Sequence, residues 1–236
     1  MNYDKYPNTL TEEEVWDAAG FIISALKESG RIDCCLIGGT ALFLHGVEER
    51  EIKDLDFVVF LREKHCDKCI HRQCCLYSRI SQAYPDRLKL VDSVKSNAPY
   101  SILMYEAPET KNTIKIDLLV PAEEAVEIPP GLTVDHVVYI DGWPVAPLEF
   151  LLYHKLLGWS KRIESFKKNK RKAVTTDTGD IYNLCELLHS NGIDPLEAPF
   201  RSVKYNVRPR LRAKQFVEYN GEDAGYYLGL VGLPGY

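Results

Sequence analysis

Two aspartates separated by a single residue are the first feature of this sequence that could do chemistry. Asp54 and Asp56 begin an apolar segment that ends at Phe60 and is typical of a β-strand. Side chains alternate along a strand with a period of two, so both carboxylates are expected on the same face of a sheet. Two carboxylates in one place repel each other unless a cation lies between them, and Mg²⁺ is the usual cation where a substrate brings phosphates. The pair therefore predicts a metal site, whereas the simpler alternative is a solvated junction between a loop and a strand.

A third carboxylate and a pair of glycines extend this pattern. Asp117 lies in a predicted strand, 113–120, among the apolar residues Ile116, Leu118, Leu119 and Val120, and a charge in such surroundings indicates a side chain that faces a site. Gly38 and Gly39 follow a short predicted strand, 34–37. The turn that they form exposes backbone N–H groups, which together with the start of the following helix can hold an anionic phosphate.

The elements that would position these residues alternate between helices and strands up to about residue 145. Thr11 is expected to cap a first helix with Glu14 as its capping-box partner, and this helix is expected to end near Gly30. Further elements are expected, in order, as a strand over 55–60, a helix over 63–83, strands over 88–91, 101–106 and 113–120, and a hairpin over 137–145 that turns at Asp141-Gly142.

From Pro147 the character of the sequence becomes helical. One helix is expected over 147–161, and another is expected to be capped by Thr176 or Asp177 and to run through Leu188. A chain of 236 residues can hold a core of ordinary size and a smaller appended module.

We therefore expect an α/β core over 1–145 and a helical C-terminal module with its tail over 146–236. The last part of this tail, 223–236, has no clear period. The N-terminal segment lacks the pattern of a signal peptide and no apolar run approaches the length of a membrane span, so we expect a cytoplasmic protein.

Ile37-Gly38-Gly39, Asp54-Leu55-Asp56 and Asp117 together resemble the signature of the nucleotidyltransferase superfamily, which includes polymerase beta and the lincosamide and kanamycin nucleotidyltransferases. The resemblance covers about residues 33–120 and implies the nucleotidyltransferase fold, a mixed sheet flanked by helices. It implies that Asp54 and Asp56 bind two Mg²⁺ ions and that Asp117 shares one of them and helps to activate an acceptor hydroxyl. Gly38, Gly39 and Thr40 would hold the β- and γ-phosphates of an NTP.

The loop before the first aspartate departs from this pattern. Arg50 to Lys53 stand where many members carry a Thr two positions before the first Asp, and loss of that hydroxyl would weaken the positioning of the nucleotide. By the same resemblance, Lys53 is expected to bind the nucleotide.

Two later segments, 147–159 and 176–181, resemble the helices that follow the core in many small members. This resemblance places Lys155 at the triphosphate, with Asp177 and Asp180 orienting either Lys155 or the acceptor. The alternatives are a Lys155 at the edge of an amphipathic helix with its ammonium in water, and an Asp180 that is an ordinary surface residue.

Cysteines and histidines cluster between residues 65 and 75. Cys66, Cys69, Cys74 and Cys75 could bind a structural Zn²⁺ ion, because their spacing includes Cys-x-x-Cys. We favour a plain helix in which the cysteines act as small hydrophobic residues. The odd total of seven cysteines fits poorly with a disulfide framework, so most of them are expected to be reduced.

The run from Lys161 to Lys172 is strongly basic within an acidic chain. A net charge of −5 and a pI near 5.7 argue against a protein that coats nucleic acid non-specifically. The run is either a solvated loop between two helices or an electrostatic funnel for a triphosphate or an RNA acceptor.

Two functions from different classes follow from these residues. The first is a Mg²⁺-dependent enzyme that transfers an NMP from an NTP to a hydroxyl of a small molecule, an RNA or a protein. The second is a catalytically silent relative that binds a nucleotide or acts as an antitoxin-like regulator. The presence of all three carboxylates favours the enzyme. A zinc-stapled interaction domain ranks last, because it depends on the cysteine cluster alone.

Overall fold

The chain forms two units in the computed structural model, which describes residues 9–30, 32–47, 52–61, 72–92, 101–121, 127–165, 168–200 and 203–233. The first unit comprises Met1–Val126 and Tyr139–Val145, and the second comprises Glu127–Val138 and Ala146–Tyr236. No helix in these described ranges has the length and the apolar character needed to cross a membrane.

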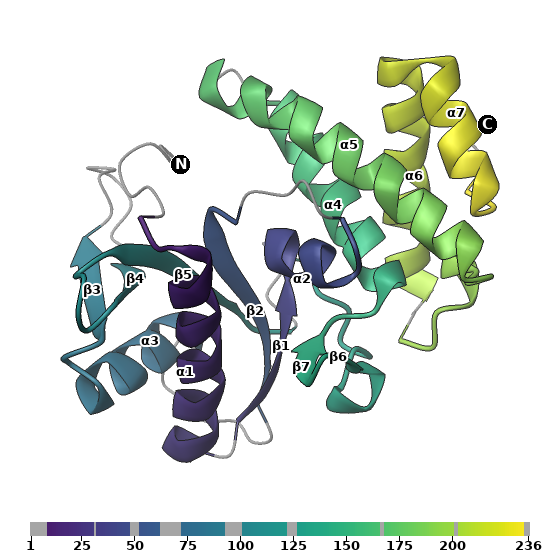
Figure 1. Cartoon of the computed structure of the whole chain (residues 1–236). Helices are drawn as coiled ribbons and strands as arrows, with labels where there is room; N and C mark the ends of the chain where they lie inside the picture. Colours follow the sequence, from purple (N-terminus) through teal and green to yellow (C-terminus); the bar gives the residue numbers. More distant parts are fainter. Residues whose placement is uncertain are drawn as a thin grey trace. The chain divides into compact units, whose positions relative to one another are not determined.

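A mixed sheet lies at the centre of the first unit (Figure 1). In the described part of the chain it has seven strands, in the order β3-β4-β5-β2-β1-β7-β6. The strands are β1 (Asp33–Ile37), β2 (Asp54–Phe60), β3 (Leu88–Asp92), β4 (Ser101–Glu106), β5 (Thr113–Leu119), β6 (Val138–Ile140) and β7 (Trp143–Val145). β2 is parallel to β5 and antiparallel to β1. The predicted α/β class, with a mixed sheet flanked by helices and a helical module after it, is confirmed.

Helices α1 (Glu12–Gly30) and α3 (Arg72–Ala83) belong to the core on one face of this sheet. Alternate residues of the central strands are buried in the same hydrophobic cluster as these helices: Leu55, Phe57, Ile116 and Leu118. Asp54, Asp56 and Asp117 alternate with those residues along the strands. Because neighbouring side chains of a strand point to opposite faces, the three aspartates lie on the face away from this core.

Local sequence signals explain two features of this unit. Thr11 N donates a hydrogen bond to Glu14 Oε2 at 2.9 Å and Glu14 N donates to Thr11 Oγ1 at 3.3 Å, which is the predicted capping box of α1. Asp141 and Gly142 have φ angles of +49° and +84°, which a two-residue hairpin turn requires. The predicted hairpin of β6 and β7 is therefore confirmed.

The second unit is mainly helical in its described residues (Figure 1). Its helices are α4 (Leu148–Ile163), α5 (Lys168–Ser190), α6 (Val203–Asn220) and α7 (Glu222–Leu230). α4 packs against α5 and α6, and α7 also packs against α5 and α6. Trp159 of α4 is fully buried, and its ring centroid lies 4.9 Å from that of Phe216 on α6.

One expectation for this unit is wrong. α5 begins at Lys168 and not at a cap near Thr176, so the end of the basic run is helical and not a loop. Lysine and arginine are good helix formers, and the run contains no Gly or Pro that would stop a helix. The tail also contains a helix, α7, although its apolar residues follow no clear period.

Candidate functional site

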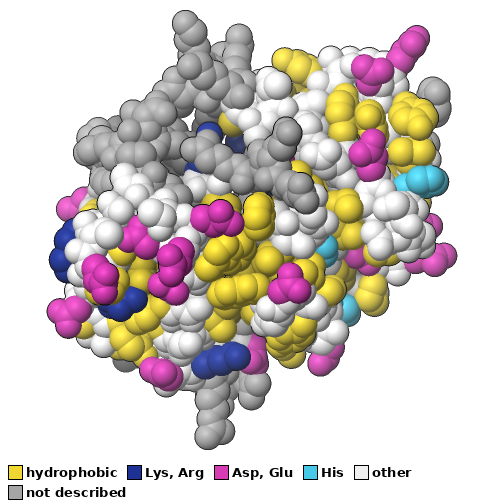
Figure 2. All heavy atoms as spheres, viewed as in Figure 1, with side chains coloured by type: hydrophobic (Ala, Val, Ile, Leu, Met, Phe, Trp, Pro, Cys, Tyr) yellow, Lys and Arg dark blue, Asp and Glu magenta, His cyan; other side chains and the backbone are white. Residues whose placement is uncertain are grey.

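The parallel pairing of β2 and β5 brings the three predicted carboxylates together. Asp56 lies beside Asp117 in this pairing, and Asp54 lies beside Lys115. One oxygen from each of the three aspartates lies within 4.8 Å of the others, and all three residues are partly exposed. On the face shown in Figure 2, acidic side chains occupy several separate places among hydrophobic ones. The site differs from such separate surface carboxylates because three of its carboxylates converge on one place.

The chemistry of this carboxylate triad fits a divalent cation. Two unit charges about 4 Å apart repel by about 1 kcal/mol in water and by about 4 kcal/mol at an effective dielectric constant near 20. A hard cation such as Mg²⁺ accepts carboxylate oxygens as ligands and removes this repulsion. The site could therefore hold Mg²⁺ through Asp54, Asp56 and Asp117.

The glycine turn packs directly against this triad. Gly38 has a φ of +68°, and a Cβ atom added there would collide with Asp56 Oδ2. Glycine is needed at this position both for the left-handed backbone and for the close approach of the carboxylate. Gly39 and Thr40 follow in α2 (Gly38–Leu44), and Thr40 Oγ1 is buried without a hydrogen-bond partner among the described residues. Thr40 therefore carries a polar atom that no described residue satisfies, two residues after Gly38.

Lys115 is a charged member of the site that we did not predict. Its ammonium donates a hydrogen bond to Asp117 Oδ2, and the residue is only 6% exposed. Burial by itself would lower the pKa of Lys115, but the carboxylates of Asp117, Asp56 and Asp54 raise this pKa above its ordinary value. The lysine is therefore positively charged. The spacing Lys115-x-Asp117 repeats that of Asp54-x-Asp56, and this was the signal in the sequence.

Side chains from α3 fix the backbone around Asp117. The described ladder between β4 and β5 ends at Ile116. Beyond that point Leu118 N donates to the Tyr77 hydroxyl at 3.2 Å, and Gln73 Nε2 donates to Leu118 O at 2.9 Å. Burial raises the pKa of Tyr77, and the charge of Asp117 adds to this rise. Tyr77 and Gln73 thus take the place of a neighbouring strand where Asp117 is presented.

A second charged group lies inside the second unit. Lys155 Nζ donates to Asp180 Oδ2 at 2.7 Å and lies 4.0 Å from Asp177 Oδ1, while Arg162 donates to Asp177. Lys155, Asp177 and Asp180 are 8%, 2% and 3% exposed. The alternatives of a Lys155 with its ammonium in water and of an Asp180 on the surface are therefore wrong.

The remaining predicted residues are Lys53 and the four cysteines of the possible zinc site. Lys53 is exposed and directly precedes β2. Cys74 is exposed with a free thiol, whereas Cys75 is disulfide-bonded. Because zinc binds thiolates, Cys75 cannot supply a ligand, and the four-cysteine zinc site is not formed. Cys66 and Cys69 lie outside the described residues.

Comparisons with known proteins place the chain near several solved structures. The sequence matches no protein-family model and no curated protein. Its structure is similar to that of JHP933 from Helicobacter pylori, with 17% identity over 95% of this chain and 91% of that chain and a TM-score of 0.44. It is also similar to the antibiotic-resistance factor ANT(2'')-Ia, with 15% identity over 89% and 100% of the two chains and a TM-score of 0.48. A third similar structure is the polymerase core of TRAMP, an RNA surveillance complex, with 13% identity over 90% and 60% and a TM-score of 0.34. At such values the likenesses carry no conclusion about function.

Proposed function

We propose that this protein is a Mg²⁺-dependent nucleotidyltransferase that transfers an NMP from an NTP to a hydroxyl acceptor and releases pyrophosphate. The observation that carries this proposal is the convergence of Asp54, Asp56 and Asp117, whose carboxylate oxygens lie within 4.8 Å of one another. A site of three hard oxygen donors, open enough to be partly exposed, suits a cation that must also contact phosphates.

Each side chain of the site has a role in this reaction. Asp54 and Asp56 hold the metal, and Asp117 shares it and accepts the proton of the acceptor hydroxyl. In this proposal two Mg²⁺ ions held by these carboxylates would neutralise charge on the triphosphate and on the attacking and leaving oxygens. Tyr77 keeps Asp117 in place, because its hydroxyl bonds to the backbone on both sides of that residue, Ile116 O at 3.3 Å and Leu118 N at 3.2 Å.

The triphosphate would be held by the glycine turn and by lysines. Gly38 lies against Asp56 of the carboxylate triad, and Gly39 and Thr40 follow it in α2, so this turn would offer its backbone N–H groups to the β- and γ-phosphates. Lys53, at the start of β2, adds a positive charge.

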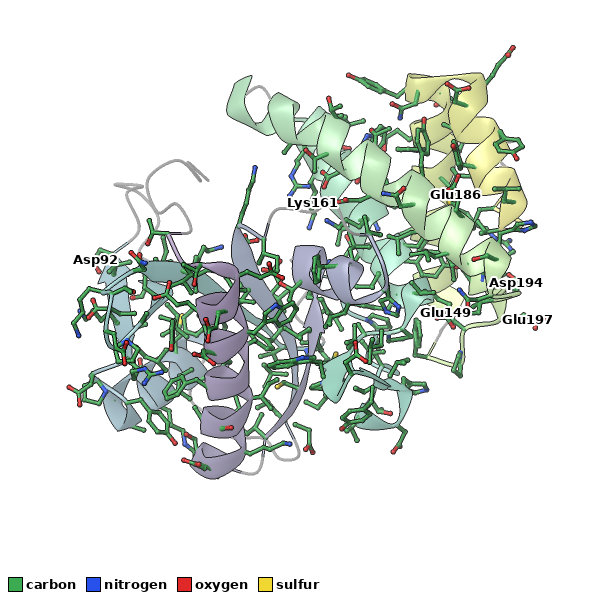
Figure 3. All side chains as sticks on the ribbon, viewed as in Figure 1. Asp92, Glu149, Lys161, Glu186, Asp194 and Glu197 are labelled. Carbon is green, nitrogen blue, oxygen red and sulfur yellow. The ribbon has the colours of Figure 1, made fainter. Side chains whose placement is uncertain are left out.

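Lys155 and the basic run complete the proposed set of partners. In this proposal Lys155, whose ammonium is held by Asp180 and Asp177, would contact the triphosphate. The basic run from Lys161 to Lys172 would attract the triphosphate or an RNA acceptor by its charge. Figure 3 shows Lys161 near the end of α4.

The test compares Asp56→Asn with a matched control, Asp92→Asn. Asp92 is an exposed aspartate at the end of β3, an edge strand of the same sheet (Figure 3). Calorimetry with a non-hydrolysable NTP and Mg²⁺ measures binding without knowledge of the acceptor. Transfer of α-labelled NTP to small hydroxyl compounds, RNA and protein measures activity.

We expect Asp56→Asn to lower transfer by about 100-fold or more, a typical loss when one stabilising group of the transition state is removed. Asp92→Asn should leave both measurements unchanged. If transfer and triphosphate binding survive Asp56→Asn undiminished, the proposal is wrong. Tight metal-dependent binding with no transfer to any acceptor would favour the catalytically silent alternative.

A further inference from the structure

Lys115 forms a compact group of four charges with the carboxylate triad. In the pairing of β2 with β5, Lys115 lies beside Asp54, and Asp117 lies beside Asp56 one step further along the strands. All four side chains share one face of the sheet, because each pair within a strand is two residues apart. The ammonium of Lys115 is also hydrogen-bonded to Asp117.

The burial of Lys115 distinguishes it from the other lysines near this sheet. Lys115 has a side chain that is 8% exposed, whereas the side chains of Lys89 and Lys111, which pair with Glu106, are 49% and 64% exposed. Exposed pairs of that kind contribute little and rearrange easily. A buried ammonium has no comparable freedom to move into water, so its charge stays beside the carboxylates.

The charge of the group sets what else it can bind. Three carboxylates and one ammonium carry a formal charge of −2, which a single divalent cation balances. A second divalent cation would leave the group with an excess of positive charge unless it arrived with an anionic ligand. Mg²⁺ is commonly bound by one or two carboxylates together with substrate phosphates.

We propose that Lys115 is a built-in counter-cation that weakens the binding of free divalent metal and makes full metal occupancy depend on the triphosphate. The inference rests on the proposed function, which assigns the carboxylate triad to metal. In the absence of nucleotide, Lys115 neutralises part of the carboxylate charge and competes with the incoming ion for Asp117. When a triphosphate is present, its negative charge offsets that of the lysine, and the metal is retained.

The experiment titrates Mn²⁺, as a probe of the Mg²⁺ site, into metal-free protein by calorimetry with no nucleotide present. Lys115→Met is compared with wild type and with Lys89→Met, which removes an exposed lysine on β3. Removing a positive charge so close to the ligands should tighten Mn²⁺ binding by about tenfold or more, which corresponds to about 1.4 kcal/mol. Lys89→Met should bind as wild type does.

A second set of titrations includes a non-hydrolysable NTP. In wild type we expect the nucleotide to tighten Mn²⁺ binding strongly, and in Lys115→Met we expect a smaller gain, because the lysine no longer opposes the free metal. If Lys115→Met does not fold, Lys115→Gln keeps a hydrogen-bond donor for Asp117 without the charge. Wild type alone is also informative: tight Mn²⁺ binding that the nucleotide does not improve would overturn the proposal.

The outcomes separate this proposal from the proposed function. Tighter binding in Lys115→Met that is lost when Asp56→Asn is added supports both. Equal affinity in wild type and Lys115→Met, with binding abolished by Asp56→Asn, overturns the role of Lys115 and leaves the metal site intact. An absence of Mn²⁺ binding in every variant, with and without nucleotide, overturns the metal site itself.

Discussion

Replacing Gly38 with alanine, compared with a control glycine, would distinguish two effects. One is the backbone strain of the turn, and the other is the loss of its contact with the carboxylate triad. Gly38 has a φ of +68°, and a Cβ atom there would collide with Asp56 Oδ2. The atom in the way is the end of a side chain, so Asp56 can rotate and the fold can survive. The rotated carboxylate would, however, leave its place beside Asp54 and Asp117.

Gly46 provides the matched control. Its φ is +97°, but a Cβ atom added there would meet nothing within 4 Å. A left-handed conformation costs a residue with a Cβ about 1–2 kcal/mol. Gly38→Ala and Gly46→Ala should therefore both lose about 1–2 kcal/mol of unfolding free energy, measured by urea denaturation.

Only Gly38→Ala should damage the site. With one of the three carboxylates displaced, Mg²⁺-dependent binding of a non-hydrolysable NTP should weaken by about tenfold or more, by analogy with the loss of other supporting contacts at metal sites. Gly46→Ala should bind as wild type does. If calorimetry finds the same affinity in both variants, the packing of the turn against Asp56 has no part in forming the site.

Three further changes test Lys155, Tyr77 and His154. Lys155→Met leaves Asp180 buried without its cation and should cost about 3–5 kcal/mol of unfolding free energy in urea; a loss below 1 kcal/mol would contradict the buried pair. Tyr77→Phe removes the acceptor of the Leu118 N–H group and should cost about 1–3 kcal/mol, with weaker Mg²⁺-dependent NTP binding as the sign that Asp117 has shifted. Burial lowers the pKa of His154 from 6.5 to about 4, so the neutral ring is favoured in the folded state. Wild type should therefore lose stability as the pH falls from 6.5 towards 4, by at most about 1.4 kcal/mol per pH unit, and His154→Gln should lose less over the same range.

Local patterns in the sequence were sufficient for much of the first unit. The Thr11 and Glu14 pair specified the start of α1, and Asp141-Gly142 specified the hairpin turn, because capping and turn formation involve residues only a few positions apart. The period of two along β2 also placed Asp54 and Asp56 on one face. These features depend on neighbours in the chain, which the sequence displays directly.

Less of the helical unit could be predicted from the sequence, for a physical reason. The basic run that opens α5 looks like a solvated segment because its charge is visible in the sequence, whereas the structure begins the helix at Lys168. Lys155 and Asp180 are 25 residues apart, and only the pairing of α4 with α5 shows that they form a buried ion pair.

The sequence by itself determined which residues could hold a metal, whereas the tertiary structure decided that they meet. Asp54 and Asp56 were a pair by spacing alone, but the parallel alignment of β2 with β5 was needed to bring Asp117 within reach. The same alignment brought in Lys115, whose charge had no visible partner in the sequence beyond Asp117. Contacts between strands depend on register, and register is fixed by the burial of the whole opposite face against α1 and α3.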